Sequence, residues 1–270
     1  MNRSSFIIYG ARGTLPVAGA GVAKYSGRTT CFGLKTAAGM VIVDAGTGIS
    51  LIDETSDEEL LPATLLFTHF HLDHVTALPF LKRLANPRSS LKLMADAKRK
   101  DWHPALMNLF AYPYWPVALT GMGAGVEFSD LPAAAGGLDL YGVHISWSPL
   151  AHPQGCLAYR LEADGKSVVI VTDHEAGHPK IDDVLLQFCS RADYLIYDAQ
   201  WTPAELAKRR GWGHSSWEDA VAFAARAGVG ELVLTHHDYR RRDDEIDAIV
   251  EAARRHFPKT RAAAEKMILF

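Results

Sequence analysis

Short apolar segments recur along the whole chain, and most of them have the length of β-strands. Residues 63–68 are largely apolar throughout, which is typical of a buried strand. The dipeptide Asp164-Gly165 separates two later segments and favours a two-residue hairpin turn. The predicted strands are residues 6–9, 31–35, 40–44, 63–68, 91–94, 126–129, 143–147, 157–163, 167–172, 194–198 and 231–235.

Apolar residues at helical spacing lie between several of these strands. The predicted helices are residues 78–84, 181–189, 203–210, 216–227 and 243–256. Pro203 suits a first helical turn, and Ser216 followed by Glu218 and Asp219 is typical of a capped N-terminus. Hairpin-like strands come first and strand–helix alternation comes later. We therefore expect one α/β domain over residues 1–270, with two β-sheets and outer helices.

Residues 102–116 interrupt this pattern with many aromatic and proline residues. The prolines exclude a long regular helix. We expect an insertion, spanning about residues 98–130, that caps a site. Aromatic faces suit either stacking on a nucleobase or packing in a dimer interface. Tyr112, Tyr114 and Trp115 are therefore candidate substrate-binding residues.

The composition places the chain among ordinary globular proteins: 48% of its 270 residues are hydrophobic and 22% are charged. A net charge of −3 provides no overall basic field for a long polyanion. The odd number of cysteines, Cys31, Cys156 and Cys189, argues against a disulfide framework and predicts a reducing, cytoplasmic location. No apolar stretch approaches the length of a membrane span, and residues 6–9 are too short for a signal-peptide core.

The strongest chemical signal is the run HFHLDH at residues 69–74, directly after the buried strand. Residues two apart in an extended segment face the same side, so His69 and His71 should point together. Asp73 and His74 should fall in the following turn and face a point close by. Three imidazoles and a carboxylate so close together are hard to hold without a cation, so the run predicts a metal site.

The sequence resembles the metallo-β-lactamase superfamily over nearly its whole length. The matching runs are YGARGTLP (9–16), VDAGTG (43–48), HFHLDH (69–74), AHP (151–153), TDH (172–174) and LTHHD (234–238). The run GHSS at 213–216 resembles the His-Ser-Thr motif of the branch that contains ribonuclease Z and related phosphodiesterases, with Ser for Thr. The resemblance implies an αββα sandwich of two mixed sheets, with a metal site at one sheet edge.

The resemblance also implies two divalent metal ions held by nitrogen and oxygen ligands. One ion would take His69, His71 and His152, the second would take Asp73, His74 and His236, and Asp173 would bridge them. Such ligands suit Zn, Mn or Fe, of which Zn is our expectation. Without the run at 69–74, a surface loop would be the better interpretation of His152, and Asp173 would also suit a helix or turn cap.

Other residues are expected to support the ligands or the chemistry. Asp44, Thr68 and His237 are expected behind the ligands, although Asp44 also suits a simple turn and His237 a solvated position. The resemblance implies that His214 donates a proton to the leaving oxygen, and helix capping or packing is the alternative. Asp73 is placed with His214 in the catalytic group.

Together these features predict a metal-dependent hydrolase, first of all a phosphodiesterase for a small phosphodiester such as a cyclic nucleotide. The ribonuclease Z branch uses a Gly/Pro-rich arm to grip tRNA, and we find no such arm in this sequence. Long nucleic acids are therefore not expected as partners, and the lack of a long apolar stretch argues against a membrane. The chain could form a homodimer. The alternatives are a tRNA 3′-processing endoribonuclease, a thioester or lactone hydrolase, and a non-catalytic metal-binding sensor.

Overall fold

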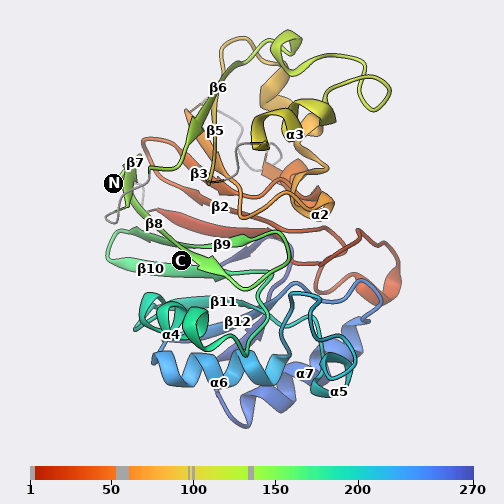
Figure 1. Cartoon of the computed structure of the whole chain (residues 1–270), viewed down its shortest axis with the longest axis vertical. Coiled ribbons are helices and arrows are strands. Elements are labelled where there is room, and N and C mark those ends of the chain that lie inside the picture. The colour runs from red at the N-terminus through yellow and green to blue at the C-terminus, as the bar shows by residue number, and fades with distance from the viewer. Residues whose placement is uncertain (1–3, 53–60, 97, 99–100, 133–136) are drawn as a thin grey trace.

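Two seven-stranded β-sheets stack face to face, with helices on both outer faces (Figure 1). The computed structural model describes residues 4–52, 61–96, 98, 101–132 and 137–270. The first sheet has the order β14 (Met267–Ile268), β1 (Ser5–Gly10), β2 (Cys31–Lys35), β3 (Met40–Val43), β4 (Ala63–Leu66), β5 (Ser90–Ala95) and β6 (Gly125–Asp130). The second has the order β13 (Thr260–Ala262), β12 (Glu231–Thr235), β11 (Tyr194–Asp198), β10 (Lys166–Val171), β9 (Cys156–Ala163), β8 (Val143–Leu150) and β7 (Leu138–Leu140). Both sheets are mixed, so the predicted αββα sandwich is confirmed.

The helices lie mainly outside the second sheet, where α4, α6 and α7 cover its outer face (Figure 1). The α-helices are α2 (Leu72–Val75), α3 (Trp102–Leu109), α4 (Pro179–Phe188), α5 (Pro203–Leu206), α6 (Trp217–Ala227) and α7 (Asp243–Arg254). The 3₁₀ turns are η1 (Ala20–Val22), η2 (Thr47–Leu51), η3 (Leu78–Phe80), η4 (Lys82–Ala85) and η5 (Leu119–Gly121). The predicted start of α6 is confirmed, because Ser216 and Asp219 each bond the other's backbone N–H.

Alternation along the strands divides the apolar side chains between layers. In β1, Phe6 and Ile8 belong to the core between the sheets, and Tyr9 belongs to the outer core of the first sheet. In β10, Val168 faces the core between the sheets and Val169 faces the core under the helices. Each such buried side chain stabilises the fold by roughly 1.5–3 kcal/mol, so both sheets are anchored on both faces.

Some predictions of local structure are wrong. Residues 78–84 do not form one helix, because Leu81 is extended (φ −69°, ψ 108°) and separates η3 from η4. The helix predicted for residues 203–210 ends at Leu206. Residues 102–116 form no long regular helix, as predicted, but they contain the eight-residue helix α3. Pro104 is tolerated because it lies in the first turn, where a missing N–H breaks no intrahelical bond. The short strands β7, β13 and β14 were not predicted.

One edge of the sandwich gathers the ends of several strands. β3 pairs in parallel with β4, and β10, β11 and β12 pair in parallel with one another, so in each sheet their carboxyl ends lie together. In open α/β sheets this edge is where ligands bind. By contrast, α3 and the loop that follows it lie at the top of the view, beyond the first sheet (Figure 1).

Candidate metal centre

The predicted metal ligands follow strands that end at this edge. His69 and His71 follow β4, His152 follows β8, Asp173 follows β10 and His236 follows β12. The structure thus brings side chains together that are far apart in the sequence.

Two further predicted ligands, Asp73 and His74, lie in the short helix α2 (Leu72–Val75) rather than in a turn before a helix. His71 is the N-cap of this helix, with extended backbone (φ −64°, ψ 151°). The change from extended backbone to helix turns the second half of the run toward a neighbouring point, as expected from the sequence.

The carboxylate of Asp173 lies between two groups of imidazoles. Its Oδ2 is 3.6 Å from His69 Nε2 and 3.7 Å from His152 Nε2. Its Oδ1 is 3.2 Å from Nε2 of both His74 and His236. Each oxygen therefore faces one group, which is the arrangement that a bridging ligand requires.

His71 and Asp73 complete the two groups. His71 Nδ1 lies 3.2 Å from His152 Nε2, and Asp73 Oδ2 lies 3.2 Å from His236 Nε2 and 3.5 Å from His74 Nε2. Two clusters of candidate ligands result, His69–His71–His152–Asp173 and Asp73–His74–His236. A third group, Asp173–Asp198–His214–His236, shares Asp173 with the first and His236 with the second.

Buried nitrogens without hydrogen-bond partners indicate that these side chains fit a divalent metal ion. Among the described residues, Nε2 of His69 and Nε2 of His74 are buried and have no hydrogen-bond partner. Buried polar atoms are nearly always satisfied, so such a pair needs an explanation. A bound metal ion would explain both nitrogens, since clustered imidazoles and carboxylates suit Zn, Mn or Fe.

The buried carboxylates and imidazoles of the two clusters shift one another's pKa values. Burial alone would raise the pKa of Asp173, but His236, His74 and His69 hold that pKa well below its usual value. Burial would lower the pKa of His236, but Asp173 and Asp73 raise it to about 9. His74 and His236 and the two carboxylates therefore stabilise each other's charged forms, and a metal ion must displace protons from these two imidazoles to bind here. Burial instead lowers the pKa values of His69, His71 and His152, which favours the neutral form that binds a metal.

Behind the ligands, Asp44 holds the loop that carries the run 69–74. Its carboxylate accepts a hydrogen bond from His74 Nδ1 at 2.7 Å, and both the N–H and the hydroxyl of Thr68 donate to it at 2.8 Å. The Thr68 hydroxyl also lies 3.1 Å from His69 Nδ1. A carboxylate behind a ligating imidazole fixes the ring and its tautomer.

Two other ligand rings are fixed from behind by groups that the sequence reasoning missed. His152 Nδ1 donates to the carbonyl of Gly213 at 2.8 Å, and His236 Nδ1 donates to Gln200 Oε1 at 3.0 Å. The N–H of Thr14 donates to Asp73 Oδ2 at 2.8 Å.

His237 is placed differently from the other predicted support residues. Its backbone pairs with the loop after β1, donating to Ala11 and accepting from Gly13. Its ring packs against Tyr25, and burial and then Arg12 lower its pKa to about 3. Within the described part of the chain, no hydrogen bond joins this ring to a predicted ligand.

His214 forms a buried pair with Asp198, a residue that the sequence reasoning also missed. His214 Nδ1 donates to Asp198 Oδ2 at 2.7 Å, and the His214 ring stacks on the His236 ring with centroids 4.8 Å apart. Asp198 ends β11, next to the strand ends that carry Asp173 and His236. Its place at the end of the strand predicted for residues 194–198 was the signal that could have found it.

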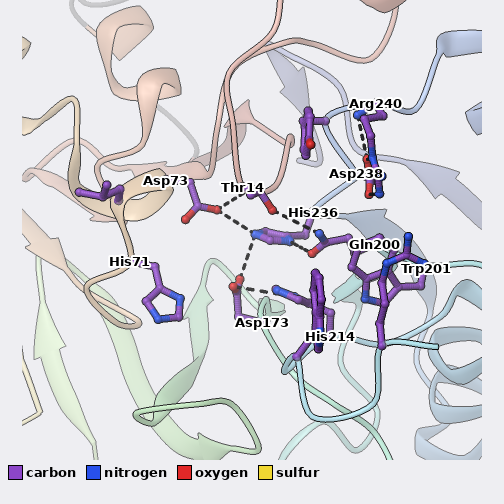
Figure 2. A pocket seen from close by; sticks show the side chains of 14 residues that line it. Thr14, His71, Asp73, Asp173, Gln200, Trp201, His214, His236, Asp238 and Arg240 are labelled. Carbon is purple, nitrogen blue, oxygen red and sulfur yellow. Dashed lines mark hydrogen bonds and ion pairs between the residues drawn. The ribbon is translucent and has the colours of Figure 1, made fainter. Parts of the chain in front are cut away.

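A pocket of about 510 Å³ opens over the second cluster (Figure 2). It is lined by Thr14, His71, Leu72, Asp73, Asp173, Gln200, Trp201, Arg209, Trp212, His214, His236, Asp238, Tyr239 and Arg240. Figure 2 shows Asp73, Asp173 and His236 turned toward one another, with His214 beside them.

The aromatic residues of the expected cap do not line this pocket. Tyr112 and Tyr114 are 94% and 78% exposed. Trp115 packs against the outer core of the first sheet and meets Phe80 edge-on. The aromatic side chains that do line the pocket, Trp201 and Trp212, were not singled out from the sequence.

The stacked sheets and the His/Asp clusters at their common edge define a metal-dependent hydrolase of the αββα class. The sequence profile described as "Beta-lactamase superfamily domain" matches residues 40–237, and the chain belongs to this family. Ribonuclease Z of Bradyrhizobium diazoefficiens is 29% identical over 250 residues, which cover 74% of this chain and 79% of that protein.

Solved structures share the fold. The metallo-β-lactamase fold protein YhfI of Bacillus subtilis superposes with a TM-score of 0.73 at 18% identity, covering 99% of both chains. A diphosphatase of the PhnP family superposes with a TM-score of 0.71 at 19% identity, covering 99% of this chain and 98% of that one. Among the described residues, no helix is both long enough and apolar enough to cross a bilayer.

Proposed function

We propose that this protein is a phosphodiesterase that uses two divalent metal ions, zinc in the first place, to hydrolyse a small phosphodiester such as a cyclic nucleotide. The observation that carries the proposal is the His214–Asp198 pair, which stacks beside the ligand His236 at the wall of the pocket. The ligand clusters on either side of Asp173 would hold the ions.

Each group of side chains would have a separate task. Bound metal ions would supply Lewis-acid chemistry, polarising a phosphoryl oxygen and activating a water nucleophile. Asp198 would hold the Nδ1–H of His214, which leaves Nε2 to carry the proton that the leaving oxygen needs. Asp73, which the sequence also predicts to be a catalytic residue, would be held in place by the hydrogen bond that it accepts from the Thr14 N–H.

Two names among the similar proteins support a phosphorus ester as substrate. One relative is a ribonuclease, an enzyme class that cleaves phosphodiesters, and one structural neighbour is a diphosphatase. A cytoplasmic location is supported by Cys31, Cys156 and Cys189, which are all free and buried.

The second candidate is a tRNA 3′-processing endoribonuclease, which the ribonuclease Z relative favours. A net charge of −3 favours the small substrate. Metal-loaded protein should be assayed with bis-p-nitrophenyl phosphate, a series of cyclic nucleotides and a tRNA precursor. The proposal expects turnover of the diester and of at least one cyclic nucleotide. Efficient cleavage of the tRNA precursor, with weak activity on every small diester, would select the second candidate. No turnover of any substrate would favour a metal-binding sensor, and thioester or lactone turnover alone would favour the remaining class.

A further inference from the structure

One side of the pocket is formed by Trp201, Arg209 and Trp212, which we call the aromatic wall. Trp201 is only 2% exposed, and its ring centroid lies 6.4 Å from that of His214. Trp212 meets Trp201 edge-on at 6.2 Å and is 60% exposed. Trp212 therefore offers a large open ring surface on which a planar ligand can stack.

Arg209 adds a cation to the aromatic wall. Its guanidinium lies 4.4 Å from the centroid of the Trp201 ring. In the part of the chain that the structure describes, Arg209 forms no ion pair, whereas Arg240 across the same pocket donates to both carboxylate oxygens of Asp238. A guanidinium plane can stack on a base and donate to its acceptor atoms.

A buried carboxylate holds the loop that carries Trp212. Glu175 is 6% exposed, and its oxygens accept the N–H of Gly211 at 2.8 and 2.9 Å and that of Gly213 at 2.9 Å. Both neighbours of Trp212 are therefore fixed to one side chain. An exposed ring on a fixed backbone can bind a ligand at a low cost in conformational entropy.

From this geometry we propose that Trp212 and Arg209 form a subsite for the planar base of a nucleotide-like substrate. The ligand class is a phosphodiester whose leaving group bears a ring with hydrogen-bond acceptors. His214 indicates where the leaving group would bind. Its ring contacts Trp201 on one side and stacks on His236 on the other, so a leaving group protonated by His214 would lie next to the aromatic wall. This placement rests on the proposed function, because it assumes that His214 donates the proton to the leaving group.

Two product-like ligands test the subsite directly. Adenosine 5′-monophosphate and ribose 5-phosphate carry the same phosphate and sugar, and only the first carries a base. Calorimetric titration of metal-loaded protein should give a dissociation constant about 5- to 150-fold lower for the nucleotide, the usual effect of one stacked base. The ratio of the two dissociation constants should fall close to one in Trp212→Ala and should be largely retained in Trp212→Phe. Tyr114→Ala is the matched control, because it removes an exposed aromatic ring outside the pocket.

Equal or undetectable binding of both ligands by the wild type would contradict the subsite, as would an unchanged ratio in Trp212→Ala. Its failure can be separated from failure of the proposed function. If bis-p-nitrophenyl phosphate is hydrolysed but the ratio is one, only the subsite is wrong. If no diester is hydrolysed but the ratio is large and depends on Trp212, only the proposed function is wrong.

Discussion

Gly213 is the position where a single methyl group should damage the metal centre most selectively. Its backbone has φ +86°, and a Cβ there would lie 2.2 Å from His152 Nδ1 and 2.4 Å from Pro153 Cδ. The same nitrogen donates to the Gly213 carbonyl at 2.8 Å. Gly213→Ala must therefore displace the His152 ring and disturb the bond that orients it.

Gly211 provides a matched control two residues earlier. Its φ is +87°, and among the described residues no atom lies within 4 Å of a Cβ built there. An L-residue in this left-handed region costs about 1–2 kcal/mol, so both alanine variants should lose similar stability from the backbone alone. Only Gly213→Ala also disturbs a group behind a ligand, which typically costs about 10–100-fold in metal affinity, or about 1.4–2.7 kcal/mol.

The assay is competition with a chromophoric zinc chelator, combined with thermal unfolding of the metal-free proteins. Without metal, we expect Gly213→Ala to unfold at a somewhat lower temperature than Gly211→Ala, because its Cβ must also displace His152 and Pro153. Gly213→Ala should bind its weaker zinc equivalent about 10–100 times less tightly than Gly211→Ala. Equal zinc affinity in the two variants would refute the argument that the Gly213 carbonyl and the space beside it position His152.

Three further predictions concern the ions, the proton donor and the substrate. Asp173→Ala should lose most of both metal equivalents, because its two oxygens face different clusters; elemental analysis that finds one ion fully retained would show that it is not a bridge. His214→Ala should lower kcat by about 10²–10⁴, the scale of a lost general acid, with unchanged metal content and a smaller loss for p-nitrophenolate esters. Metal loss in this variant would instead make His214 a ligand, together with its neighbours Asp198 and His236. At fixed metal concentration, turnover of the small diester should change little between low and moderate salt, whereas a steep fall would indicate many phosphate contacts and a long nucleic acid.

The sequence was sufficient to predict the sandwich and the convergence of the ligands. Strands such as β3 are continuous apolar runs, and the run 69–74 places four chemically distinctive side chains close together. The remote ligands His152 and His236 followed from the resemblance, since nothing local distinguishes them from loop residues. The structure supplies what spacing could not, namely that both lie around Asp173.

The sequence was less informative where a role depends on tertiary contact. Glu175 has no local signal, because its function is to accept N–H groups from a loop more than thirty residues away. Tyr112 and Tyr114 gave a strong local signal, but composition alone does not fix which side of the molecule a segment covers. Trp201 and Trp212 reach the pocket from the segment between β11 and α6, and they stand eleven residues apart there, so no local aromatic cluster marks them in the sequence.

The most direct test of the account is a metal titration of catalysis. Protein stripped with a chelator should be inactive on bis-p-nitrophenyl phosphate, and activity should rise with added zinc until it saturates at two equivalents per chain. That stoichiometry is the one expected from two ligand clusters, one that contains Asp173 and one whose His74 and His236 face its other carboxylate oxygen. Activity that persists in the stripped protein, or no activity at any metal content, would contradict a metal-dependent phosphodiesterase.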